Sequence, residues 1–187
     1  MRKAVPLLVL TILVFAQMGL WAAPQGGRTP DSKEVSDLLS QAKTEAVQLH
    51  QDASDMEAFS HMNVGWATHA DRIMTIRDDV NKMGETVAKL NRAESEASPW
   101  QKTAIRRVNP LLQEMGANVT ATIEHLNKEK GQFINTPEHQ DYLKANAELA
   151  DKMAGLISDF VDYGQTRERF RTLSDKLELS ERGRRRD

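Results

Sequence analysis

The chain contains no cysteine, so no disulfide can stabilise its fold. The same absence excludes thiolate metal sites, cysteine nucleophiles, covalently attached haem and lipidation at cysteine. Aromatic residues make up only 5% of the 187 residues, and there are only six prolines, which suits a mostly helical protein. The formal net charge of -2 gives no overall field that would attract nucleic acid. We therefore expect a fold stabilised by its core alone and no nucleic-acid partner.

Catalytic sequence motifs are also missing. The chain has no Gly-x-Ser-x-Gly, no P-loop, no dinucleotide-binding fingerprint and no His-Glu-x-x-His. None of the five histidines has a glutamate three residues before it, as di-iron bundles require. No pair of nucleophile and base can be assembled from the periodic segments described below. The sequence therefore predicts that the protein is not an enzyme.

The first residues have the three-part layout of a secretory signal. Arg2 and Lys3 form a basic head, residues 4–20 are almost wholly apolar, and Ala22 and Ala23 are small residues where a peptidase would cut. We expect cleavage after Ala22, with Ala23 as the alternative, and export to the periplasm or the cell exterior. An uncleaved anchor is the competing interpretation, because the apolar stretch nearly spans a bilayer of ~30 Å. After cleavage we expect no stable membrane span.

Four later segments carry apolar residues at alternating spacings of three and four, as in helices that pack into a bundle. They span residues 31–62, 66–95, 98–130 and 136–180. Asp31 or Ser32, Ser98 and Thr136 stand at three of the starts and can cap them. The clearest apolar seam consists of Trp66, His69, Ile73, Ile76, Val80, Met83, Val87 and Leu90. Because the loops are short, we predict an all-α, antiparallel up-down-up-down four-helix bundle.

This interpretation divides the chain into a signal peptide (1–22), a flexible leader (23–30), the bundle (31–180) and a basic disordered tail (181–187). When the four helices are aligned at the turns that connect them, apolar residues at equal distances from the turns should form core layers. One layer comprises Ala42, Val87, Val108 and Phe160, and the next comprises Leu39, Leu90, Ile105 and Tyr163. Pro110 lies inside the third helix and removes a backbone hydrogen bond. We expect a bend there rather than two helices in series, because the apolar spacing continues through it.

Most of the histidines fall near the two turns at one end of the predicted bundle. The candidate metal ligands are His61, His69, His125, His139 and Met62, since imidazole and thioether suit zinc and copper. A small periplasmic metal- or haem-binding bundle is therefore the alternative function. We favour no cofactor, because the ligand spacing matches no known pattern. In that case the imidazole of His69 should meet Tyr142, and no two ring nitrogens should lie within about 4 Å.

The last predicted helix is longer than its partners, so its end should extend beyond the bundle. Leu173, Leu177 and Leu179 would overhang, with Arg167, Arg169 and Arg171 beside them. This end could bind an unknown protein partner, a second copy or an anionic lipid surface. Alternatively, the leader folds back and covers the leucines. The favoured function is that of an exported, non-enzymatic bundle that acts by binding or structural assembly.

Three stretches resemble uncharacterised exported helical-bundle proteins of acidobacteria. They are residues 98–104 (SPWQKTA), 110–114 (PLLQE) and 156–164 (LISDFVDYG). The resemblance implies a protein of the bacterial envelope or a secreted one. It implies no activity, cofactor or functional residue.

Overall fold

The computed structural model describes residues 29–62, 65–128 and 136–184, with side chains up to residue 178. Four long helices account for most of these ranges, and no strand occurs within them. The helices are α1 (Lys33–Ser60), α2 (Trp66–Arg92), α3 (Pro99–Lys128) and α4 (Pro137–Arg184), with a short 3-10 helix, η1 (Glu94–Glu96), between α2 and α3. The all-α prediction is confirmed. The predicted signal peptide lies outside the described residues.

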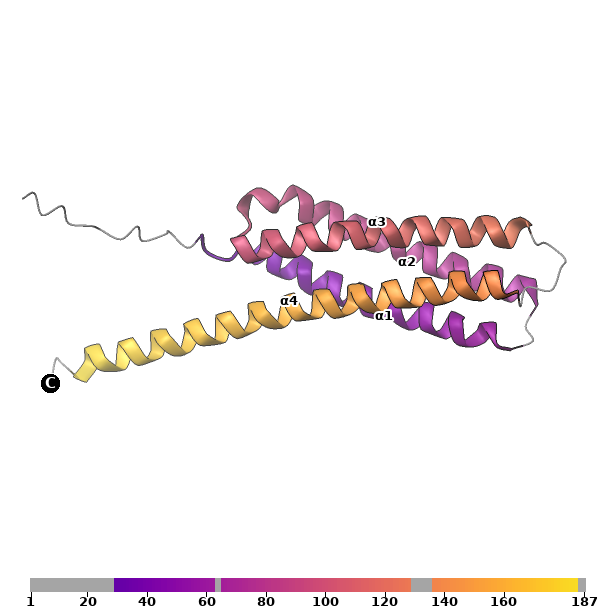
Figure 1. Cartoon of the computed structure of the whole chain (residues 1–187). Helices are drawn as coiled ribbons and strands as arrows, with labels where there is room; N and C mark the ends of the chain where they lie inside the picture. Colours follow the sequence, from indigo (N-terminus) through magenta and orange to yellow (C-terminus); the bar gives the residue numbers. More distant parts are fainter. Residues whose placement is uncertain (1–28, 63–64, 129–135, 185–187) are drawn as a thin grey trace, which may run out of the picture.

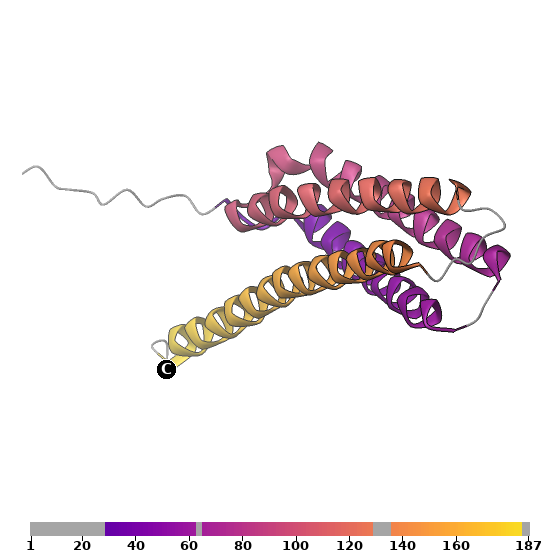
Figure 2. The same cartoon turned by 45° about the vertical axis from the view of Figure 1, so that its right-hand side comes forward.

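The four helices lie side by side around one core (Figure 1; Figure 2). α1 packs against α2 and α4, and α3 packs against the same two helices. The core is mostly aliphatic, and its methionines Met56, Met83, Met115 and Met153 are all buried. Within the described residues, no helix has the length and apolar character needed to cross a bilayer.

Local hydrogen bonds explain where the helices begin. The Ser32 Oγ accepts the backbone N–H of Val35 at 3.4 Å, and the Thr136 Oγ1 accepts that of His139 at 3.2 Å, so both predicted caps are confirmed. α3 starts differently, because no backbone N–H of its first turn donates to the Ser98 Oγ. Instead the Oε1 of the buried Gln101 accepts the N–H of Ser98 at 2.9 Å. The same side chain bonds both backbone groups of Ser32 and so ties α1 to α3.

The seam predicted for residues 66–95 is confirmed along most of α2. Six of its positions are buried, and only Trp66 and Val80 are half-buried. α3 also continues through Pro110 as one helix, so two helices in series are excluded there. Beside the proline, the Asn109 Nδ2 donates to the Ile105 carbonyl at 3.1 Å. The expected bend at Pro110 stays a prediction.

The inward face predicted for the last helix is wrong by about one residue. Tyr163, expected in a core layer, is 47% exposed. Phe160 is only half-buried, and the Arg107 guanidinium lies 5.7 Å from its ring centroid. The side chains that fill the core from α4 are Leu143, Asn146, Ala147, Ala150, Met153, Ala154, Ile157 and Val161. Several inward positions carry the small or polar residues Asn146, Ala147 and Ala150, while Leu149 and Leu156 lie at the flanks, and this misled an assignment based on apolar size.

Candidate functional site

The first candidate site is the end of α4. The helix has 48 residues, whereas α1, α2 and α3 have 28, 27 and 30. Arg167 marks where it leaves the bundle, because its Nε donates to the Oδ2 of Asp31, just before α1, at 3.3 Å. Beyond this point α4 runs on alone in both views (Figure 1; Figure 2). The bundle was predicted to end at residue 180, but α4 continues to Arg184, into the predicted disordered tail.

Large apolar side chains on this end face water. Phe170, Leu173 and Leu177 are 72%, 58% and 66% exposed, and their spacing places them on one face of the helix. Leu179 lies outside the described side chains. Thr29 and Pro30 line a groove with Phe170, so the end of the leader reaches this region yet leaves the phenyl ring largely open. The rest of the leader lies outside the described residues.

The second candidate site is the end of the bundle that holds the histidines. His69, in the first turn of α2, and His139, in the first turn of α4, are 1% and 0% exposed. The Nδ1 of His69 lies 3.4 Å from the Nε2 of His139. The prediction that His69 meets Tyr142 is therefore wrong, and so is the expectation that no two ring nitrogens lie within about 4 Å. The partner of His69 is an imidazole 70 residues away in sequence.

The other predicted ligands do not join this pair. His125 stacks on His139 with a centroid distance of 5.7 Å, and its Nδ1 lies 3.7 Å from a carboxylate oxygen of Glu138. His61 and Met62 are exposed. Within the part of the chain that the structure describes, no group of three or more His, Asp or Glu side chains is arranged to hold a metal ion. Two imidazoles supply half of the four ligands that a tetrahedral zinc site needs.

Electrostatics keep the histidine pair neutral at pH 7. Burial lowers the pKa of His69, and the charge of Arg72 lowers it further. Burial, followed by His69 and His125, lowers the pKa of His139 to about 4. The Nε2 of His69 and the Nδ1 of His139 are buried without a hydrogen-bond partner. The pair therefore joins α2 to α4 as a neutral contact, and among the described residues no carboxylate bonds either of the two rings.

Buried polar side chains continue inward from the histidines. The Asn146 Nδ2 donates to the Thr122 Oγ1 at 2.9 Å, and the Thr122 hydroxyl donates to the Asn118 carbonyl at 2.7 Å. Sequence reasoning missed this contact between α3 and α4, because polar residues other than histidine were not considered for core positions. The available signal was spacing: Asn146 lies seven residues after His139 and four before Ala150.

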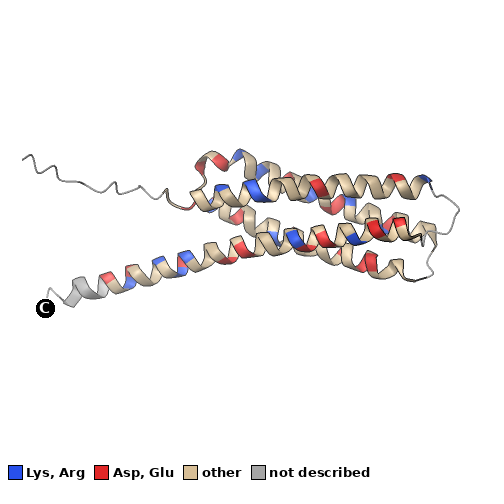
Figure 3. Ribbon diagram, in the orientation of Figure 1, with Lys and Arg blue, Asp and Glu red and all other residues tan. Residues whose placement is uncertain are grey.

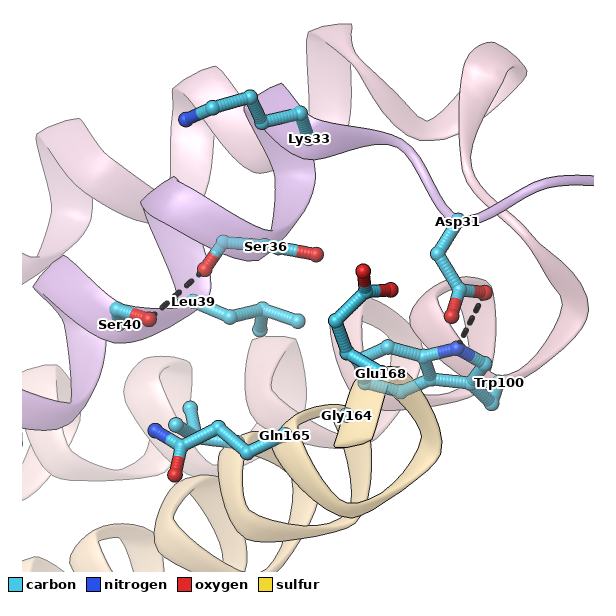
Figure 4. A pocket seen from close by; sticks show the side chains of 10 residues that line it. Asp31, Lys33, Ser36, Leu39, Ser40, Trp100, Gly164, Gln165 and Glu168 are labelled. Atoms are coloured by element: carbon cyan, nitrogen blue, oxygen red, sulfur yellow. Dashed lines mark hydrogen bonds between the residues drawn. The ribbon is translucent and has the colours of Figure 1, made fainter. Parts of the chain in front are cut away.

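A third candidate site is a cavity of about 450 Å³ between the start of α1, the start of α3 and α4, here named the α1–α4 cavity (Figure 4). The Trp100 indole forms one wall and is fixed by its Nε1, which donates to the Asp31 Oδ1 at 2.7 Å. α4 approaches this ring at Gly164, where an added Cβ would lie only 2.7 Å from the Trp100 Cη2. The sequence could not reveal the cavity, because three distant segments form it.

A carboxyl pair joins α1 to α2 on the side of the bundle. Burial, followed by the neighbouring Asp52 carboxylate, raises the pKa of Asp79 to about 6. One Asp79 oxygen is buried without a hydrogen-bond partner. The neutral Asp79 carboxyl therefore contributes stability that is fully present below its ordinary pKa of 3.8 and is lost as the pH rises from there to about 6.

Comparisons with protein-family models, curated proteins and solved structures find no match to this chain. The function must therefore be argued from the chemistry of the described residues.

Proposed function

We propose that the chain is an exported helical-bundle protein without catalytic activity, which acts by assembly through the end of α4. The observation that carries this proposal is the exposed face of Phe170, Leu173 and Leu177 on a helix that extends past its partners. The end of α4 that projects from the bundle has no neighbouring helix in the chain as described, and helices without tertiary packing are only marginally stable in water. Packing of the exposed face against another helix would bury these three side chains and stabilise the end of α4.

The partner that we propose is a second copy of the chain. Between residues 165 and 178, α4 carries four cationic side chains (Arg167, Arg169, Arg171 and Lys176) and three anionic ones (Glu168, Asp175 and Glu178). Both signs are interspersed along this stretch (Figure 3). Such a balance causes little repulsion between two copies, and it attracts an anionic membrane only weakly. An apolar face with mixed flanking charges is typical of helices that pair with helices.

Export and helix direction belong to the same proposal. The basic head, apolar stretch and small residues before position 24 support a cleaved signal and a periplasmic or extracellular location. An antiparallel up-down-up-down order is supported by contacts between helix ends. Gln101 bonds Ser32 where α3 and α1 both begin, whereas the Trp66 Nε1 at the start of α2 donates to the Leu126 carbonyl near the end of α3.

Sedimentation equilibrium of the chain from Ala23 onward tests the assembly. We expect a concentration-dependent dimer, and we expect a monomer when Phe170 and Leu177 are both replaced by serine. Val47→Ser is the matched control, because Val47 is an exposed apolar residue (50%) on the body of the bundle. Circular dichroism checks that each variant keeps its helices. A monomeric parent protein, or equal loss of the dimer in the control, would overturn the proposal.

A further inference from the structure

The walls of the α1–α4 cavity have a defined chemical character. Leu39, Trp100 and Val161 supply apolar surface from α1, α3 and α4. The indole is held between the Asp31 carboxylate and the backbone at Gly164, so its position is set before any ligand arrives. A volume of about 450 Å³ lies in the usual range of small-molecule sites.

Most charged groups around the cavity are already paired. The Asp31 carboxylate accepts hydrogen bonds from Trp100 and Arg167. The Lys33 ammonium lies 2.6 Å from the carboxylate of Asp37. The remaining charge is the exposed carboxylate of Glu168, which has no hydrogen bond or ion pair among the described residues. Figure 4 shows this carboxylate beside the indole, pointing into the space between Ser36 and Asp31.

We propose that the α1–α4 cavity binds a small organic cation. Its charged nitrogen would lie at Glu168, and its apolar part would lie against Trp100, Leu39 and Val161. An ammonium or quaternary ammonium group is attracted both by a carboxylate and by the face of an indole ring. A neutral ligand would leave the Glu168 carboxylate without a counter-charge, and an anion would be repelled by it. The proposal does not depend on assembly through the end of α4, because the cavity lies within one chain.

Fluorescence titration tests this site. In the chain from Ala23 onward, Trp66→Phe leaves Trp100 as the only tryptophan. The probes are choline and its uncharged isostere 3,3-dimethyl-1-butanol, which differ in charge but hardly in shape. We expect a saturable change in Trp100 emission with choline and at least about fivefold weaker binding of the isostere, which is the factor for ~1 kcal/mol. Calorimetry on the chain with Trp66 intact checks that the substitution itself does not create the site.

The Glu168→Gln variant distinguishes specific binding at this carboxylate from non-specific adsorption of the probe. It should weaken choline binding at least about fivefold, because it removes the charge and keeps the shape. Glu114→Gln is the matched control, since Glu114 is exposed on α3 and does not line the cavity. Equal binding of the isostere, an unchanged affinity in Glu168→Gln, or no saturable signal with choline would each overturn the proposal.

Discussion

Replacing His139 with glutamine should remove much of the acid sensitivity that we expect of this bundle. His139 is fully buried, and among the described residues its ring has one hydrogen-bonding contact, to the neutral His69. The titratable or charged side chains around the pair are Arg72 on α2, His125 on α3 and Glu138 on α4. From α1, the buried side chains near this end are the uncharged Met56 and Ser60. A proton on His139 would therefore gain no direct counter-charge.

The magnitude follows from the pKa of His139. It falls from the ordinary 6.5 to about 4 on folding, so the unfolded chain binds more protons between these two values. Stability contributed by the neutral imidazole is fully present above about pH 6.5 and is lost as the pH falls through this window. At 1.36 kcal/mol per pKa unit, the loss reaches about 3 kcal/mol near pH 4. That is a large fraction of the ~5–15 kcal/mol stability of an ordinary domain.

Urea denaturation at several pH values between 7 and 4 measures this loss. The parent chain should lose about 3 kcal/mol more than His139→Gln over that range, because contributions of the carboxylates are common to both proteins and cancel. His50→Gln is the control, since His50 is half-buried on α1, away from this pair. It should keep the full acid sensitivity. Parallel pH profiles for the parent and His139→Gln, or a His139 imidazole that titrates near pH 6.5 by NMR, would refute the reasoning.

Other predictions address separate parts of the chain. Asp79→Asn should raise the urea midpoint much more at pH 8 than at pH 4, because it removes the charge that burial and Asp52 disfavour, and at pH 4 this carboxyl is neutral in the folded state and partly neutral in the unfolded chain; equal effects at both values would contradict this. Ala42→Leu should destabilise the fully buried site by ~1–3 kcal/mol, and an unchanged midpoint would show that the core has room there. Added zinc or copper should hardly shift the melting temperature; a shift of several degrees that disappears in His69→Ala would establish a metal site. Mass spectrometry of exported protein should find a chain that begins at residue 23 or 24, and an intact first residue would support the anchor.

Local features of this protein could be predicted because their causes lie within a few residues. The seam of α2 follows from apolar spacing, and the starts of α1 and α4 follow from Ser32 and Thr136, whose hydroxyls reach backbone groups three residues ahead. The exposed end of α4 could also be anticipated from length alone. In each case the periodicity of the helix converts sequence distance directly into position.

The rotation of α4 and the partner of His69 could not be predicted in this way. A helix packed on two neighbours has a wide apolar face, and Leu149, Leu156 and Phe160 at its flank outweighed the small inward residues Ala147 and Ala150 in the pattern. The contact between His69 and His139 depends on how α2 and α4 are rotated against each other. Because the predicted rotation of α4 was wrong by about one residue, Tyr142 was expected to contact His69 instead of His139.

The sequence by itself determined the helices, the apolar seam of α2 and the absence of any stabilising cysteine, because spacing and composition act locally. Only the tertiary structure decided which imidazoles meet, that Asp52 and Asp79 share a half-buried site, and that Trp100 and Glu168 border one cavity. These contacts join residues on different helices. Their distances and pKa values depend on the rotation and register of whole helices, which the packing of all side chains sets together.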